Sequence, residues 1–255
     1  MATELTQAHV LVADDAPTVR QSLRMTLAQC GINRVDAASS IGETRRRLRN
    51  AQYDVVLCDY HFGEGMNGQE LLEEMRQSGE LPLYTIWIII TAEAAYEKVV
   101  AVAEIGPDDY LIKPFTSALL TQRLSASWNR KRFLKPIYDK INEDDVLGAI
   151  EAAKALIPKA EGFRTDLMRL LSSLLLEAGQ LEQARLLFEE ILTQRMIPWA
   201  KLGLAKALIR QGKKNQAEGT LQAAIVEHAQ YVDAYEELAS MYMADGRLDQ
   251  AMAVF

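Results

Sequence analysis

The 255-residue chain has few of the residues that staple a small fold or bind a structural metal. It contains two cysteines, Cys30 and Cys58, without Cys-x-x-Cys or Cys/His spacing, which excludes a disulfide framework and a zinc finger. Both are expected to be small buried apolar residues. No run approaches the ~20 apolar residues of a membrane helix, and the first nine residues lack the basic-then-apolar layout of a signal peptide. We therefore predict a cytoplasmic protein without a membrane segment.

Basic clusters are also scarce. Lys and Arg number 28 against 35 Asp and Glu, a net charge of −7. The densest basic run, Arg45, Arg46, Arg47 and Arg49, is typical of the solvated face of an amphipathic helix, and phosphate binding there is the less favoured alternative. No helix-turn-helix with a basic recognition helix is visible, so no nucleic-acid partner is expected. The length and the 49% hydrophobic content indicate two packed domains.

Short apolar runs alternate with amphipathic stretches from residue 9 to about residue 128. The runs are rich in Val, Ile and Leu without polar alternation, which is typical of parallel strands covered on both faces. Right-handed crossovers then predict an α/β doubly wound five-stranded parallel sheet in a first domain, 1–128. The strands are expected at 9–13, 34–37, 53–58, 85–90 and 110–112, and the helices at 18–29, 41–49, 69–77, 96–104 and 117–127.

Polar residues follow four of these five strands. Asp14 and Asp15 follow the first, Asp59 the third, Thr91 the fourth and Lys113 the fifth, and the carboxyl ends of parallel strands meet at one edge of the sheet. Taken alone, the aspartates and the threonine fit turns or helix caps, and the lysine fits a solvent-facing residue. Together, carboxylates ~4 Å apart repel by several kcal/mol at an effective dielectric of ~20. A divalent cation relieves that repulsion, and oxygen ligands without Cys or His favour Mg²⁺.

The ordered set of motifs resembles the receiver domain of bacterial two-component response regulators, over about residues 5–128. It comprises HVLVA before Asp14, DVVLC before Asp59, WIII before Thr91, and DDYLIKPF around Lys113. The resemblance implies phosphoryl transfer from a histidine kinase to an aspartate with Mg²⁺. The residues that it implies are the phosphoacceptor Asp59, Thr91 and Lys113 at the phosphoryl group, the switch residue Tyr110, and the Mg²⁺ ligands Asp14, Asp15, Asp59 and the backbone carbonyl of His61.

One segment departs from the family pattern. Residues 60–68 replace the Met-Pro step of many receivers and take a longer route to the glycine matched by Gly68. This loop lines the expected site, so it bears on phosphoryl lifetime and on the choice of kinase. His61 fits a solvent-facing loop residue better than a relay histidine or a second phosphoacceptor.

Apolar residues recur at helical spacing from residue 130 onward, in a unit of 33–34 residues. Gly179, Gly212 and Gly246 mark the unit, which has the pattern helix, Gly-containing turn, helix. This pattern resembles tetratricopeptide repeats over about 166–255, after a weaker helical unit near 146–157, and a generic helical bundle is the alternative. The second domain, 129–255, is thus expected to be an all-α, TPR-like helical repeat. The helix pairs are expected at 166–178 and 181–193, 200–211 and 214–228, and 233–244 and 248–255.

The favoured function is a phosphorylation-controlled adaptor. A stacked helical array offers a concave groove for a protein partner, and the only catalysis expected is the chain's own phosphotransfer and dephosphorylation. A phosphorylation-independent scaffold is the alternative. A Mg²⁺-dependent aspartate-based phosphatase is less favoured, because such enzymes place a second Asp two residues after the nucleophile, where this chain has His61.

Two expectations concern the ends of the helical domain. Residues 117–132 predict a helix that runs from the first domain into the second, and Pro136 is expected to end or kink it. Leu248, Met252 and Phe255 have no following helix to cover them. Because a solenoid needs its last apolar face covered, we expect a natural chain truncated here at Phe255, or a homodimer through this face.

Overall fold

The computed structural model describes residues 5–61, 65–92, 106–194 and 197–254. The chain divides into two compact units, 1–138 and 139–255. The division falls within one long helix, α5 (Ser117–Asn142). Among the helices of the described residues, none combines the length and the apolar character needed to cross a bilayer.

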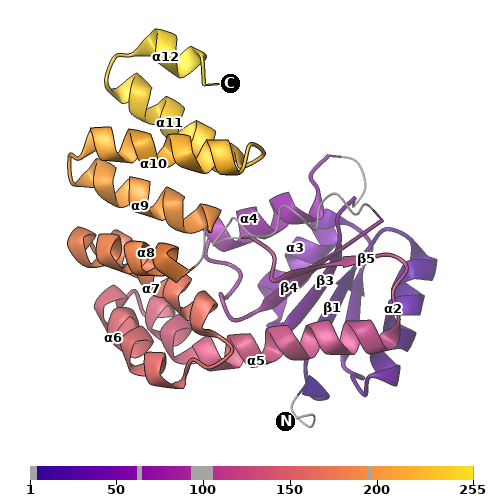
Figure 1. Ribbon diagram of the computed structural model, residues 1–255. Coiled ribbons are helices and arrows are strands. Elements are labelled where there is room, and N and C mark those ends of the chain that lie inside the picture. Colours follow the sequence, from indigo (N-terminus) through magenta and orange to yellow (C-terminus); the bar gives the residue numbers. More distant parts are fainter. Residues whose placement is uncertain (1–4, 62–64, 93–105, 195–196, 255) are drawn as a thin grey trace. The chain divides into compact units, whose positions relative to one another are not determined.

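A five-stranded parallel sheet forms the centre of the first unit, in the order β2-β1-β3-β4-β5 (Figure 1). The register sets Asp59 opposite Ile90 and Thr91 opposite Ile112, so the carboxyl ends of β3, β4 and β5 lie level. The predicted doubly wound sheet is confirmed. Its strands are β1 (Val10–Ala13), β2 (Val35–Ala38), β3 (Val55–Asp59), β4 (Ile86–Thr91) and β5 (Asp109–Ile112).

Helices cover both faces of this sheet, because alternate residues of a strand point to opposite sides. On one face, Val10 packs in a cluster that includes Leu27 of α2 and Leu124 of α5. On the other, Leu11 packs in a cluster that includes Leu48 of α3 and Leu71 of α4. The helix expected at 96–104 lies outside the described residues. The helices before α5 are α2 (Pro17–Gln29), α3 (Ile41–Asn50) and α4 (Gly68–Gln77).

Two expectations are corrected in this unit. Pro136 does not end α5, which continues to Asn142, because the φ of proline is helical and the flanking Leu134 and Ile137 are buried. Cys58 is buried as expected, but Cys30 is only half-buried. The Sγ of Cys30 donates to the Thr26 carbonyl, at 3.1 Å. This thiol therefore has polar surroundings as well as apolar ones.

Three arginines of the basic run on α3 form ion pairs with acidic side chains of the same unit. Arg45 pairs with Glu74 at 2.6 Å, and Arg47 pairs with Glu43 at 2.9 Å. Arg49 pairs with Glu80 at 2.8 Å. Neighbouring carboxylates therefore offset the positive charge of this helix face.

The second unit is a series of helices. Consecutive helices from α6 to α12 pack against each other, and α9 also contacts α7 and α11. This all-α architecture is consistent with the predicted helical repeats. After α5 the helices are α6 (Val146–Leu156), the short 3-10 helix η2 (Ile157–Lys159), α7 (Arg164–Glu177), α8 (Leu181–Gln194), α9 (Pro198–Arg210), α10 (Lys214–Glu227), α11 (Val232–Ala244) and α12 (Leu248–Met252).

The same helix cap ends α7, α9 and α11. Gly179, Gly212 and Gly246 have φ of 70°, 76° and 72°, a left-handed conformation that favours glycine. In each cap the N–H after the glycine donates at 2.9 Å to a carbonyl five residues earlier. The 33- and 34-residue spacing of the sequence therefore corresponds to a repeated three-dimensional turn.

Candidate functional site

The ammonium group of Lys113 lies between two carboxylates at the carboxyl edge of the sheet. Its Nζ donates to Asp59 Oδ1 at 2.7 Å and to Asp14 Oδ2 at 3.0 Å. The Asp14 side chain is 3% exposed and that of Asp59 is 14% exposed. Residues 54 and 99 positions from Lys113 in sequence are thus brought together, as the order of the strand ends predicts.

Opposing effects act on the ionisation of Asp59. Burial raises the pKa of its carboxyl above the ordinary value, and Asp14 and Asp15 act in the same direction, while Lys113 pulls it down. Burial lowers the pKa of Lys113, but its hydrogen bonds to Asp59 and Asp14 outweigh burial and raise the pKa overall. One ammonium therefore only partly compensates the acidic groups at this edge.

The backbone around Asp14 and Asp15 is held by polar contacts. Asp14 Oδ1 accepts the N–H of Ala16 at 2.9 Å. Arg20, in the first turn of α2, donates to the carbonyls of Asp14 at 2.6 Å and Asp15 at 2.9 Å. Asp15 itself is exposed. The two neighbouring aspartates thus differ, with Asp14 buried against Lys113 and Asp15 open to solvent.

The start of α4 is packed against the backbone of Asp59. Gly68 donates its N–H to the Tyr60 carbonyl at 2.9 Å, and a Cβ at Gly68 would lie 2.2 Å from the Asp59 carbonyl oxygen. Only glycine fits there. Asn67 caps the helix with its side chain, and Glu70 returns a bond to the N–H of Asn67 at 2.8 Å, a capping box.

Thr91, Tyr110 and His61 occupy different environments. Thr91 ends β4, is 1% exposed, and its carbonyl accepts the N–H of Lys113 at 2.7 Å. Tyr110 is 2% exposed, and its hydroxyl donates to Gln69 Oε1 at 2.8 Å. His61 is exposed, with its ring edge-on to Tyr60 at 4.9 Å between centroids.

The side chains at this edge offer carboxylate oxygens, the kind of ligand that a magnesium ion takes. Across the part of the chain that the structure describes, no group of three or more His, Cys, Asp or Glu side chains is placed to hold a metal. Mg²⁺ usually takes only one or two protein carboxylates and completes its shell with water and phosphate oxygens. Asp14 and Asp59 converge on one cationic group and supply two such carboxylates.

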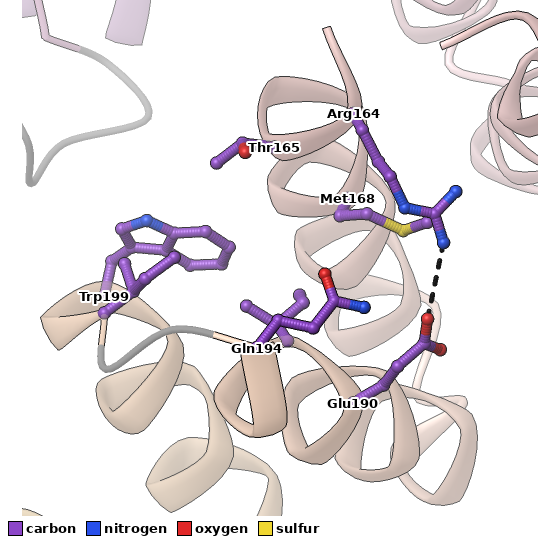
Figure 2. Close-up of a pocket in the computed structure, with 8 residues that line it drawn as sticks. Arg164, Thr165, Met168, Glu190, Gln194 and Trp199 are labelled. Atoms are coloured by element: carbon purple, nitrogen blue, oxygen red, sulfur yellow. Dashed lines mark hydrogen bonds and ion pairs between the residues drawn. The ribbon is translucent and has the colours of Figure 1, made fainter. Parts of the chain in front are cut away.

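A cavity of about 160 Å³ lies among α7, α8 and α9 in the second unit. Trp199 and Met168 line it, and an ion pair of 3.4 Å between Arg164 and Glu190 lies at its rim (Figure 2). None of the predicted site residues lines this cavity. It is a feature of the helical unit alone.

Several known proteins are similar to the first unit. Residues 10–125 match the family "Response regulator receiver domain". The chemotaxis protein CheY-3 of Vibrio cholerae is 31% identical over 121 residues, 48% of this chain and 92% of that protein. The chemotaxis protein CheY1 of Helicobacter pylori is 32% identical over 119 residues, 45% of this chain and 92% of that protein. The chain belongs to the response regulator receiver family.

A solved receiver domain from Clostridium thermocellum is 29% identical, with a TM-score of 0.43, covering 50% of this chain and 98% of that one. Membership in the receiver family makes the chain a two-component response regulator, a class of signalling protein. Receiver domains interact with histidine kinases.

Sequence reasoning missed two contacts of this receiver site. Gln69, which accepts the Tyr110 hydroxyl, carries no signal beyond its place after Gly68. Arg20 donates to the carbonyls of Asp14 and Asp15, just after the first strand. It lies on an amphipathic helix, where an arginine on the polar face does not indicate a particular partner. The capping box was readable in the sequence, since Asn67 and Glu70 have the spacing that begins a helix.

Proposed function

We propose that this response regulator accepts a phosphoryl group from a histidine kinase on Asp59. The observation that carries the proposal is the contact of Lys113 Nζ with both Asp59 and Asp14, at 2.7 and 3.0 Å. It supports the proposal because it brings two carboxylates and one ammonium group together at one edge of the sheet, and one of these carboxylates is the proposed nucleophile. When bound, Mg²⁺ would neutralise charge on the transferring oxygens, held by Asp14, Asp59, Asp15 and the His61 carbonyl.

The chain's own residues supply positioning and charge. A carboxylate oxygen of Asp59 forms the new bond to phosphorus as the bond from phosphorus to the kinase histidine nitrogen breaks, and that nitrogen keeps the electron pair. Phosphoryl transfer depends mainly on alignment and on neutralising the equatorial oxygens. Lys113 offers the phosphoryl group a cation, and the Thr91 hydroxyl offers it a donor.

The acyl phosphate would then act as a switch. It adds acceptor oxygens beside Thr91, and the position of Tyr110 is proposed to respond to the movement of Thr91. The proposed output is a changed affinity of the helical repeats for a protein partner. The repeated caps at Gly179, Gly212 and Gly246 support a stacked array of this kind.

Catalysis beyond the chain's own phosphotransfer and dephosphorylation is not part of the proposal. A phosphorylation-independent scaffold would not need Lys113 held between Asp14 and Asp59. An aspartate-based phosphatase would need a second acid two residues after Asp59, where His61 stands.

The test is phosphorylation of the full chain by acetyl phosphate, followed by intact mass spectrometry. We expect a single phosphoryl adduct with Mg²⁺, no adduct when EDTA is present from the start, and no adduct on Asp59→Asn. The Asn side chain keeps the volume of Asp and removes the nucleophile. Equal labelling of Asp59→Asn, or none of the wild type, would refute the assignment.

A further inference from the structure

The hydroxyl of Tyr110 has a specific partner on another element. It donates to Gln69 Oε1 at 2.8 Å, across 41 residues of sequence, and the ring is buried. Burial, with Tyr60 and Glu73 adding to it, raises the pKa of Tyr110 to about 12. The hydroxyl therefore keeps its proton at neutral pH and serves as the donor.

The amide of Gln69 is held in one orientation. Its Nε2 donates to Glu73 Oε1 at 3.0 Å, four residues along α4. An ionised carboxylate only accepts hydrogen bonds, so Glu73 requires the NH₂ side of the amide. That leaves Oε1 directed at Tyr110, the side that an O–H donor needs.

The backbone that carries Gln69 is anchored to the phosphoacceptor strand. Gly68, the residue before Gln69, packs so closely on the Asp59 carbonyl that no side-chain carbon would fit at this position. The N–H of Gln69 itself donates to Asn67 Oδ1 at 2.9 Å. Glu73, Gln69 and Tyr110 therefore form a short chain of hydrogen bonds, and its middle member, Gln69, follows directly after the glycine that packs on Asp59.

We propose that Gln69 is a positioning residue that holds Tyr110 in its buried position before phosphoryl transfer, with Glu73 fixing the amide. The inference rests on the proposed role of Tyr110 as the switch residue. One net hydrogen bond shifts a two-state population by roughly 2- to 12-fold. We take phosphorylation to favour the buried position of the Tyr110 ring. Because such coupling is reciprocal, a contact that favours the buried ring then also favours phosphorylation.

The direct test measures the exposure of the Tyr110 ring by NMR in the full chain. Tyrosine is labelled with carbon-13, the Tyr110 signal is assigned by its loss in Tyr110→Phe, and exposure is measured as broadening by a soluble paramagnetic agent. We expect several-fold greater exposure in Gln69→Leu. Glu73→Leu should give a smaller increase, and Glu73→Gln, which keeps an acceptor, should resemble wild type.

Gln77→Leu is the matched control, because Gln77 is an exposed residue at the end of the same helix. It should leave the ring as buried as in wild type, and thermal melts should show all variants folded. A Gln69→Leu ring as buried as the wild-type ring would overturn the proposal. So would equal exposure in Gln77→Leu.

A second arm separates this inference from the proposed function. With acetyl phosphate and Mg²⁺, Gln69→Leu should reach a phosphorylated fraction several-fold lower than wild type at subsaturating donor. Absence of phosphorylation in the wild type would refute Asp59 as acceptor, whereas the ring-exposure result would still decide the role of Gln69. An unchanged fraction together with an exposed ring would refute the coupling to phosphorylation.

Discussion

Two clusters of charged side chains in the receiver unit have opposite balances. At the carboxyl edge of the sheet, one ammonium, Lys113, lies between two carboxylates, Asp59 and Asp14. Around Asp108, three cations surround one carboxylate: Arg130 and Lys131 lie 3.0 Å from Oδ1. The third cation, Arg76, lies 3.4 Å from Oδ2.

The surrounding polar groups explain why each balance is tolerated. The extra cations near Asp108 donate to backbone carbonyls, as Lys131 does to Leu83 at 2.5 Å and Arg76 to Gly106 at 2.9 Å. Asp108 also accepts the N–H of Trp87 at 2.9 Å. At the carboxyl edge, the side chain of Asp59 has partial access to solvent. The cations around Asp108 thus share their charge among one carboxylate and several backbone carbonyls, while the acidic cluster is suited to bind a further cation.

The largest effect is expected at Asp108, where Asp108→Asn leaves three cations around a neutral side chain. Burial opposes the ionisation of Asp108. The three nearby cations, Lys131, Arg76 and Arg130, nevertheless keep its pKa below the usual value. Breaking such a buried pair costs about 3–5 kcal/mol. Urea unfolding followed by circular dichroism should show that loss, and a loss below about 1 kcal/mol would mean that the cluster is not an anchor.

The next effect is a pH dependence that Lys131 introduces. Burial lowers the pKa of Lys131 to about 8, against an ordinary value of 10.5. Between these values the unfolded chain binds more protons than the folded chain, so this group makes the free energy of unfolding rise with pH from about 8 to 10.5. Lys131→Met should remove that rise from the unfolding curves. An identical pH profile in the variant would contradict the assignment.

Lys113→Ala sharpens the division of labour at the acidic cluster. It removes the cation proposed to face the phosphoryl group and leaves both carboxylates, so titration calorimetry should still detect Mg²⁺ binding. The conformational response to phosphorylation should be weaker, measured as the change in the NMR chemical shifts of Thr91 and Tyr110. Complete loss of Mg²⁺ affinity would place Lys113 among the groups that support the metal.

The smallest effect is expected for Asp59→Asn, which is the matched change to Asp108→Asn. Burial raises the pKa of Asp59, so its charged form is not favoured by folding, and Lys113 keeps Asp14 as a partner. The free energy of unfolding should change by less than about 1 kcal/mol. A loss as large as that of Asp108→Asn would show that both clusters are structural.

Hydrophobic pattern was sufficient to predict the five strands and most of the helices among the described residues. The strand expected at 85–90 is Ile86–Thr91, and the helix expected at 41–49 is Ile41–Asn50, because buried apolar runs and capping residues are local signals. The continuation of α5 through Pro136 was not predictable, because local sequence does not report that buried residues stabilise the helix on both sides of it.

Contacts between distant side chains were predictable only where topology brings strand ends together. Asp14, Asp59 and Lys113 follow three strands of one sheet, and their meeting follows from that topology. Arg130 and Asp108 are 22 residues apart, and Gln69 and Tyr110 are 41 apart. Neither pair lies on a shared period or a common edge, so their contacts depend on rotamers and helix placement that no pattern encodes.

The most direct test of the central claim locates the acyl phosphate on the chain. After reaction with acetyl phosphate and Mg²⁺, borohydride reduces an aspartyl phosphate to homoserine, which peptide sequencing by tandem mass spectrometry can place. We predict homoserine at position 59 and nowhere else, with none in Asp59→Asn. Homoserine at Asp14 or Asp15, or a phosphoryl group on His61 without homoserine at 59, would contradict the account.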